Sequence, residues 1–330
     1  MTDNVNHPNH YTQSGVECID YIRDMISPFA GVVAGDLQNV LKYTWRAHDK
    51  NGVEDIKKAK WYMQHAIKMI NKHGFSEFIA ENGEDMISLR SHNAIEGKKQ
   101  VIERLPEQEH QYYRIVTDSL ISDNLSFYYC QNKVIEALDD WETVFEGKKK
   151  SEEKNVNHPQ HYADGKIECI DYLEVMVHPY SGIVAGCIQN ALKYTWRSHG
   201  KNGVEDIEKA IWYLKFADKE INRQLMEQEN TGQLLSLRPL DERELNNNEK
   251  RLCREGYLQV VEALPTVTER KCYTLLYGAL KEGRFIKDAS YRKEAIQALE
   301  EWVNGYYKDK NEVKNIVVDV TNGSMSNVRK

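Results

Sequence analysis

The stretch LKYTWRAHDKNGVEDI, residues 41–56, recurs almost unchanged as LKYTWRSHGKNGVEDI, residues 192–207. Only two positions differ, Ala47 against Ser198 and Asp49 against Gly200. The apolar residues before the Asp-Lys-Asn-Gly segment follow the three-and-four spacing of a helix, and a second helical pattern begins after it. The stretch therefore predicts two helices joined by a turn, present twice in one chain.

The repeat is much longer than this stretch. A constant shift of 151 residues superposes NVNHPNHY (4–11) on NVNHPQHY (155–162) and ECIDY (17–21) on ECIDY (168–172). After residue 62 the match weakens but continues, because ALDDW (137–141) still corresponds to ALEEW (298–302). A repeat of this length indicates a duplicated domain rather than a short solenoid repeat.

The composition of the connecting segments predicts where each copy begins and ends. The charged segment EGKKKSEEKN (146–155) is typical of a solvated linker between the copies. We predict a helical domain over 1–75 with an extension over 76–150, a second domain over 151–226 with an extension over 227–308, and a tail over 309–330.

Apolar spacing predicts helices over residues 17–26, 35–48 and from 53 onward. Each extension is expected to add two more, which in the first copy cover 97–122 and 127–146. No segment alternates convincingly between apolar and polar residues, as a strand would. The expected fold class is all-α: two tandem copies of a small helical domain, each followed by a helical extension, packed as a pseudo-dimer.

The chain has 330 residues, of which 41% are hydrophobic and 29% charged, and a net charge of −7. This balance is typical of a soluble helical protein and gives no support to a general nucleic-acid binder. The six cysteines are scattered, and no run of about 18 apolar residues occurs. We therefore expect a cytoplasmic protein with reduced thiols that does not enter a membrane.

One face of the 35–48 helix carries a repeated set of polar residues. Asn39, Lys42, Tyr43 and Arg46 return as Asn190, Lys193, Tyr194 and Arg197. Two cations, an amide and a phenol on one stripe can hold a phosphate together with a base or a sugar. A solvated face is the alternative for any single helix, and the recurrence of all four residue types favours the functional interpretation.

The turn and the N-terminal arm carry further candidates. Lys50 and Lys201 lie in the turn, whereas Asp55 and Asp206 lie in the first turn of the next helix, where a carboxylate either complements the helix dipole or holds a divalent metal. The arm contributes His7, His10 and Tyr11, with His158, His161 and Tyr162 in the second copy. H-x-x-H alone is a weak zinc signal, so these histidines are expected to anchor the arm or to contact a substrate.

Together, HPxHY, ECIDY and NxLKYxWRxHxKNGVEDIxKAxWY resemble a phage domain family formerly of unknown function, over about residues 6–72 and 157–223. That family includes the early nucleotide kinase of T-seven-type coliphages, which lacks a P-loop. The resemblance implies ATP as phosphoryl donor and a deoxynucleoside monophosphate as acceptor. Lys42, Arg46, Lys50, Lys193, Arg197 and Lys201 would then be catalytic, and His7, His10, Tyr11, Asn39, Tyr43 and their second-copy equivalents would bind nucleotide. Mg²⁺ would be held by Asp20, Asp55, Asp171 and Asp206.

Two other functions stay open at this stage. The first is a non-catalytic nucleotide binder that sequesters a host signalling nucleotide or regulates a host enzyme. The second is nucleotide pyrophosphohydrolysis, because Glu17, Asp20, Glu54 and Asp55 could together cage Mg²⁺. The preferred base, the activity of each copy, oligomer contacts and the role of the extensions are also open, although the repeat favours a pair of phosphate sites.

Overall fold

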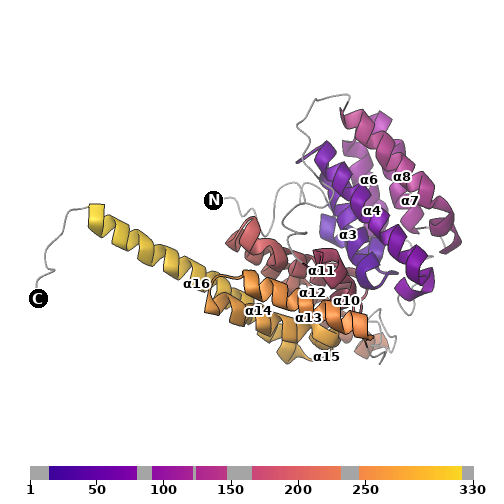
Figure 1. Ribbon diagram of the computed structural model, residues 1–330. Helices are drawn as coiled ribbons and strands as arrows, with labels where there is room; N and C mark the ends of the chain where they lie inside the picture. Colours follow the sequence, from indigo (N-terminus) through magenta and orange to yellow (C-terminus); the bar gives the residue numbers. More distant parts are fainter. Residues whose placement is uncertain (1–14, 80–90, 122–123, 147–165, 232–244, 322–330) are drawn as a thin grey trace, which may run out of the picture.

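The computed structural model describes residues 15–79, 91–121, 124–146, 166–231 and 245–321. Within these ranges the chain forms helices and two isolated β-bridges, so the predicted all-α class is confirmed. The first copy and its extension lie together on one side of the molecule, and the second copy and its extension lie on the other (Figure 1). No helix within these ranges has the length and apolar character needed to cross a membrane.

The first copy contains α2 (Cys18–Ile26), α3 (Gly31–Arg46), α4 (Val53–His73) and the short η1 (Phe75–Phe78), followed by α6 (His92–Arg104), η2 (Glu107–Glu109), α7 (His110–Ile121) and α8 (Asn124–Glu146). The second copy contains α10 (Cys169–Val177), α11 (Gly182–Arg197), η3 (Ser198–Gly200) and α12 (Val204–Thr231), followed by α13 (Asn247–Ala263), α14 (Val267–Leu280), η4 (Lys281–Gly283), α15 (Arg284–Lys287) and α16 (Ala289–Thr321). The helix order of the two domains is the same, as the repeat predicts.

The single helix expected over residues 97–122 is wrong, because the structure divides this segment into α6 and α7. Leu105, the last residue before Pro106, is extended (φ −78°, ψ 145°). A residue before proline is pushed out of the helical region by the proline ring, and proline itself has no N–H to donate. The break lets α7 turn back and pack against α8.

The two copies meet through α3 and α11, which lie side by side with their N-termini together. Gly31 N donates to Tyr180 O at 2.8 Å, and Gly182 N donates to Phe29 O at 2.7 Å, so each copy supplies the same bond to the other. Gly31 and Gly182 have φ of +58° and +51°, a region that side-chain-bearing residues rarely adopt. This crossing defines a pseudo-twofold axis that passes between the two helices.

Each extension is attached to its own copy by the same contact. A Cβ placed on Gly97 in α6 would lie 2.5 Å from Tyr21 Cδ2, and one on Gly256 in α13 would lie 2.4 Å from Tyr172 Cδ2. The tyrosine hydroxyl groups then bond to a tyrosine in the next helix of the extension, with Tyr113 OH donating to Tyr21 OH at 3.0 Å. The extensions therefore repeat the same packing although their sequences have diverged.

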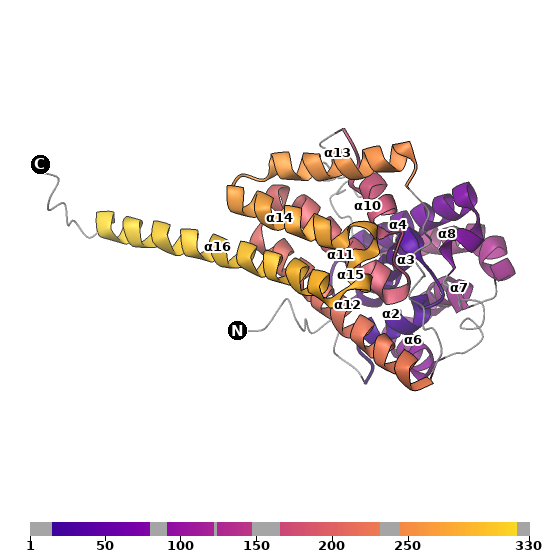
Figure 2. The same ribbon diagram turned by 90° about the horizontal axis from the view of Figure 1, so that it is seen from below.

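The last helix, α16, packs against α12 and α14 and then projects beyond the body of the molecule (Figure 2). The backbone of residues 309–321, which the sequence assigns to a tail, continues this helix to Thr321.

Candidate functional site

The approach of α3 to α11 depends on two glycines and two glutamines. A Cβ on Gly35 would lie 1.6 Å from Gln189 Oε1, and one on Gly186 would lie 1.6 Å from Gln38 Oε1. Each glutamine side chain thus fills the space left by the missing side chain of the opposite helix. No larger residue fits at either glycine without moving its partner, so these positions set the separation of the two helices.

One turn further along, two lysines and two asparagines form a closed cluster across the axis. Lys42 Nζ donates to Asn39 Oδ1 at 2.6 Å and to Asn190 Oδ1 at 3.1 Å. Lys193 Nζ donates to the same two oxygens, at 3.0 and 2.8 Å respectively. Both asparagine amides donate to a carbonyl one turn earlier in their own helix, which fixes the direction of the oxygens.

Both ammonium groups are buried and lack an acidic partner. Lys42 is 5% exposed and Lys193 is 3% exposed, and no carboxylate of the described residues forms an ion pair with either lysine. Burial lowers the pKa of Lys42 well below its ordinary value, and Lys193 and Arg46 lower it further. Burial and Arg197 lower the pKa of Lys193 in the same direction. Their charged forms are therefore disfavoured in this setting, and an anion placed beside them would favour both.

Arg46 and Arg197 flank the lysines and are held by the carboxylates that the sequence proposed as metal ligands. Arg46 binds Asp55 through Nε (2.9 Å) and through Nη2 (3.1 Å), and Asn51 donates to the same carboxylate. Arg197, Asp206 and Asn202 repeat this arrangement at 2.8, 3.0 and 3.0 Å. Both carboxylates are fully buried. A two-bond pair of this kind fixes the plane of a guanidinium and orients it.

Aromatic rings surround the cations on both sides of the axis. Lys42 Nζ lies 5.0 Å from the ring centre of Tyr43, and Lys193 Nζ lies 5.2 Å from that of Tyr62 in the other copy. The hydroxyl of Tyr62 also accepts from Lys193 Nζ at 3.3 Å. Ring faces and neutral oxygens compensate a buried ammonium only in part, so a negatively charged ligand would be strongly favoured here.

Further cations lie at the rim of this cluster, and they come from both copies. Burial lowers the pKa of Lys50, and its charged neighbours include Lys209 and Glu205 of the second copy. Burial likewise lowers the pKa of Lys201, whose neighbours include Lys58 and Glu54 of the first copy. The sequence predicted a pair of sites, whereas the structure gathers both sets of residues about one axis.

The carboxylates predicted to hold Mg²⁺ do not fit that role as they stand. Both oxygens of Asp55 and of Asp206 accept hydrogen bonds from arginine, and Asp20 pairs with Arg23 at 2.8 Å. Burial and Glu174 raise the pKa of Asp171, which makes its charged form less favourable. Among the described residues, no three His, Cys, Asp or Glu side chains gather as a metal site would require.

Six predicted nucleotide-binding residues lie outside the described residues: His7, His10, Tyr11, His158, His161 and Tyr162. Their role stays a prediction. The other predicted cationic, amide and tyrosine residues are all found at the α3–α11 interface or at its rim.

A second buried polar group was missed by the sequence interpretation. Asp36 Oδ2 lies 2.6 Å from His65 Nδ1, and Gln189 Nε2 donates to Asp36 Oδ1 at 2.9 Å. Glu174 of the second copy lies 3.4 Å from His65 Nε2. The second copy has Cys187 and Phe216 at the positions of Asp36 and His65. A comparison of the two copies could have found this polar pair, because both of its members are absent from the second copy.

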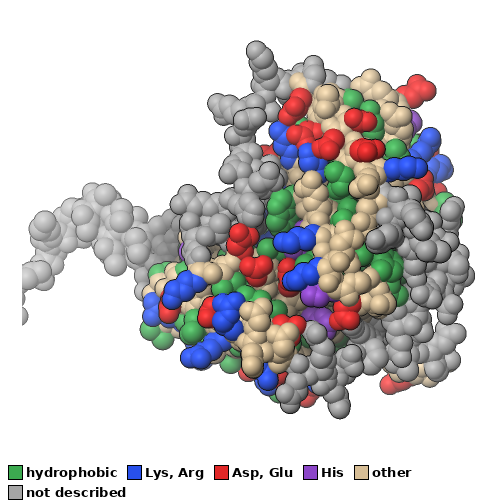
Figure 3. All heavy atoms as spheres, turned by 45° about the vertical axis from the view of Figure 1, so that its right-hand side comes forward, with side chains coloured by type: hydrophobic (Ala, Val, Ile, Leu, Met, Phe, Trp, Pro, Cys, Tyr) green, Lys and Arg blue, Asp and Glu red, His purple; other side chains and the backbone are tan. Residues whose placement is uncertain are grey.

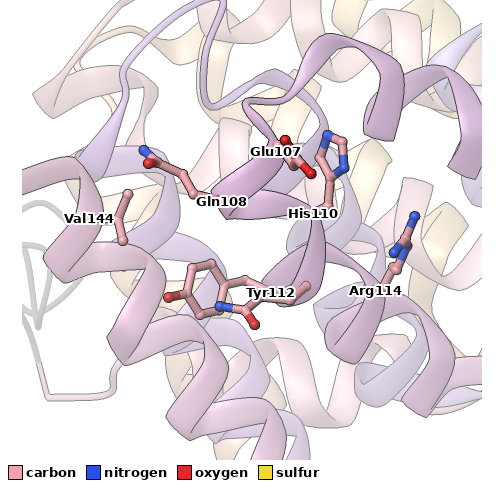
Figure 4. Close-up of a pocket in the computed structure, with 7 residues that line it drawn as sticks. Glu107, Gln108, His110, Tyr112, Arg114 and Val144 are labelled. Carbon is pink, nitrogen blue, oxygen red and sulfur yellow. The ribbon is translucent and has the colours of Figure 1, made fainter.

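Two other surfaces lack the cationic character of this interface. On the face in Figure 3, lysines and arginines are interspersed with aspartates and glutamates, so the coloured part of this face carries no broad positive surface. A hollow of about 540 Å³ lies at the first extension, where Figure 4 shows Glu107 beside His110, with Val144 contributed by the neighbouring helix. Its charged residues are of both signs, which gives it no preference for a phosphate.

A family model described as a protein of unknown function (DUF3310) matches residues 5–64 and again residues 156–215. No curated protein and no solved structure matches the chain. The family model thus matches two tandem segments of the chain, one in each copy, and the two-copy organisation predicted from the repeat is confirmed. The family description assigns no activity, so the relation to a nucleotide kinase stays a prediction.

Proposed function

We propose that the protein binds nucleotides through their phosphates between α3 and α11 and transfers a phosphoryl group from ATP to a deoxynucleoside monophosphate. The observation that carries this proposal is the pair of buried ammonium groups, Lys42 and Lys193, which share two neutral oxygens and have no acidic partner among the described residues. A phosphate is the ligand whose charge and acceptor oxygens complement such a pair.

The flanking arginines fit the same reaction. Arg46 and Arg197 are oriented by Asp55 and Asp206, and a guanidinium held in this way can stabilise charge that develops on a transferred phosphoryl group. Phosphoryl transfer depends mainly on positioning and on electrostatic stabilisation, and it needs no covalent nucleophile from the protein. The acceptor phosphate is already an anion, so it can attack without losing a proton to a general base.

Magnesium enters this proposal with the substrate, as the ATP–Mg²⁺ complex. Because Asp55 and Asp206 are occupied by arginine, we assign no protein carboxylate to the metal and derive no step from one. The role of the chain's own residues is to bind and orient phosphates.

The activity is tested by incubating the purified protein with ATP, Mg²⁺ and a panel of deoxynucleoside monophosphates, followed by chromatography of the nucleotides. We expect a deoxynucleoside diphosphate together with ADP, and no product from the Lys42→Ala, Lys193→Ala double variant. Lys98→Ala is the matched control, because Lys98 pairs with Asp118 in the first extension, away from α3 and α11. Absence of any diphosphate from the wild type would contradict phosphoryl transfer.

A non-catalytic nucleotide binder is the second candidate, and one observation favours it: the buried carboxylates of Asp55 and Asp206 are engaged by arginines rather than facing a ligand. Such a protein would bind a nucleotide stoichiometrically in a calorimeter and return it unchanged in the same chromatographic assay. Pyrophosphohydrolysis receives less support, because Asp20, Glu54 and Asp55 each pair with a cation of their own copy.

A further inference from the structure

The cationic residues in and around the lysine cluster occur in equivalent pairs about one axis. Lys42, Arg46, Lys50 and Lys58 of the first copy correspond to Lys193, Arg197, Lys201 and Lys209 of the second. A ligand on this axis meets the same groups from two opposite directions. A ligand that fits this site is therefore expected to match the twofold arrangement of the cations as well as their charge.

The two central lysines cannot act as separate sites. Lys42 and Lys193 donate to the same two oxygens, those of Asn39 and Asn190, so one phosphate that reaches the first ammonium also lies beside the second. Two phosphate dianions placed there independently would repel each other strongly in a buried setting. The centre thus suits one phosphate group or one continuous chain of phosphates.

The rim extends the positive region to both sides of this centre. Lys50 has Lys209 of the other copy among its charged neighbours, and Lys201 has Lys58. Lys209 and Lys58 each pair with a glutamate, Glu205 and Glu54, so Lys50 and Lys201 are the rim cations that this proposal uses. Tyr43 and Tyr194 lie beside the central lysines, and Arg46 and Arg197 lie over the faces of these two rings, 4.8 and 4.6 Å from the ring centres. The cationic groups therefore continue outward from the axis in two equivalent directions. Together they cover a longer region than a single terminal phosphate can contact.

We propose that the two copies form one composite site that binds one ligand per chain, with a polyphosphate chain across the axis and a nucleoside at each end. This inference rests on the proposed function, namely that nucleotide phosphates bind at Lys42 and Lys193. During phosphoryl transfer, ATP and the deoxynucleoside monophosphate meet through their phosphates, so that together they form one phosphate chain with a nucleoside at each end. An acceptor phosphate oxygen bonds to the γ-phosphorus of ATP while the bond from that phosphorus to the β-phosphate oxygen breaks, and ADP leaves with the electron pair.

The experiment is isothermal titration calorimetry of the full chain with a P1,P5-di(nucleoside) pentaphosphate, compared with ATP, with a deoxynucleoside monophosphate and with inorganic tripolyphosphate. We expect one pentaphosphate per chain, bound more tightly than ATP or the monophosphate alone. Lys42→Ala and Lys193→Ala are each expected to weaken that single binding event by about 10- to 100-fold, because each removes one charged hydrogen-bond donor from the same ligand.

Exposed rim residues provide variants that do not disturb the core. Lys50→Ala and Lys201→Ala should weaken binding by similar smaller factors, whereas Lys98→Ala should leave it unchanged. Two pentaphosphates per chain, with Lys42→Ala removing only one of them, would overturn the composite site and leave the proposed function standing. Binding of ATP and the monophosphate without any binding of the pentaphosphate would overturn the ligand class. Failure of all four probes to bind the wild type would overturn the proposed function itself.

Discussion

Gln38 and Gln189 occupy equivalent positions, yet their surroundings differ. Gln189 Nε2 donates to Asp36 at 2.9 Å, whereas neither side-chain atom of Gln38 has a hydrogen-bond partner among the described residues. The reason is the residue opposite, since Cys187 replaces Asp36 in the second copy. A fully buried amide without a partner costs about 1–3 kcal/mol of folding free energy.

Replacing Gln38 by Met should therefore stabilise the protein by about 1 kcal/mol, because the unpaired amide disappears while a side chain of similar length still covers Gly186. Gln189→Met is the matched control, and it should destabilise by about 1–3 kcal/mol because it removes a donor from a buried carboxylate. Urea denaturation of both variants gives the two free energies of unfolding. Equal changes of the same sign would contradict this account.

The buried pair of Asp36 and His65 predicts a pH dependence. Burial alone would lower the pKa of His65, but Asp36 and Glu174 outweigh it and raise the pKa from 6.5 to about 9. A pKa raised by folding stabilises the protein fully below pH 6.5, and this stabilisation is lost as the pH rises through 9. The two and a half pH units between these values correspond to about 3 kcal/mol.

The measurement is the free energy of unfolding at pH 6 and at pH 9.5, for the wild type and for the Asp36→Asn, His65→Phe double variant, which has no titratable group at either position. The advantage of the wild type should shrink by about 3 kcal/mol between the two pH values. Titrations remote from this pair occur in both proteins and cancel in this difference. A difference that does not change with pH would refute the ion pair.

Much of the candidate site could be predicted at the scale of single residues, because an exact repeat marks polar positions that folding alone does not require. Lys42, Arg46 and their partners were found in this way. The engagement of Asp55 by Arg46 could not be predicted, because a carboxylate in the first turn of a helix is equally consistent with a dipole, a metal or an ion pair. Only the geometry distinguishes them.

At the scale of the element, α3 shows where the sequence pattern misleads. Its apolar spacing predicts one buried face, with Asn39 and Lys42 on the opposite side. Asn39 is fully buried and Lys42 is 5% exposed, because α11 covers the polar stripe with an identical stripe. Amphipathic periodicity describes a helix against one core, and it cannot show that a second helix will cover the polar face. Even so, both ends of α2 and the start of α4 agree with prediction to within about a residue, whereas α3 begins at Gly31 rather than at residue 35.

The closeness of α3 and α11 predicts a large effect of one methyl group. Gly35→Ala should destabilise the protein by about 1–3 kcal/mol, because the new Cβ would overlap the Gln189 side chain, whose own Cβ lies only 2.9 Å away. Gly278→Ala in α14 is the control, since nothing lies within 4 Å of the added atom, and it should stabilise by roughly 0.5–1 kcal/mol. Thermal melts of both variants check these opposite signs.

At the scale of the whole molecule, the two copies also contact each other away from the axis. There their side chains differ in charge and complement each other. Arg23 of the first copy lies 3.1 Å from Glu220 and 5.3 Å from the ring of Phe216 in the second. The equivalent of Arg23 is Glu174, which faces His65 instead. Pairing of a first copy with another first copy would place Arg23 against a cationic histidine, so the contacts favour one copy of each kind.

Reversing one of these charges should weaken the association of the copies. Arg23→Glu places a carboxylate beside the buried Glu220 and should lower the free energy of unfolding by roughly 2 kcal/mol, as expected when a partly buried ion pair loses one partner. Lys99→Glu, at an exposed lysine of α6, should change it by less than about 0.5 kcal/mol. Denaturant midpoints of the two variants decide the comparison, and equal shifts would show that the charge at this contact has no special role.

The covalent link between the copies has a consequence for how the protein can change. In a dimer of identical subunits every substitution appears twice, on both sides of the axis, and a favourable mismatch such as acid against histidine cannot be confined to one side. A fused chain is free of this constraint away from the lysine cluster, where Asp36 and His65 of the first copy correspond to Cys187 and Phe216 of the second. On the axis, each copy completes the other's lysine cluster, so a change in either copy alters the whole site. Divergence at the flanks and sameness at the centre are then two results of one duplication.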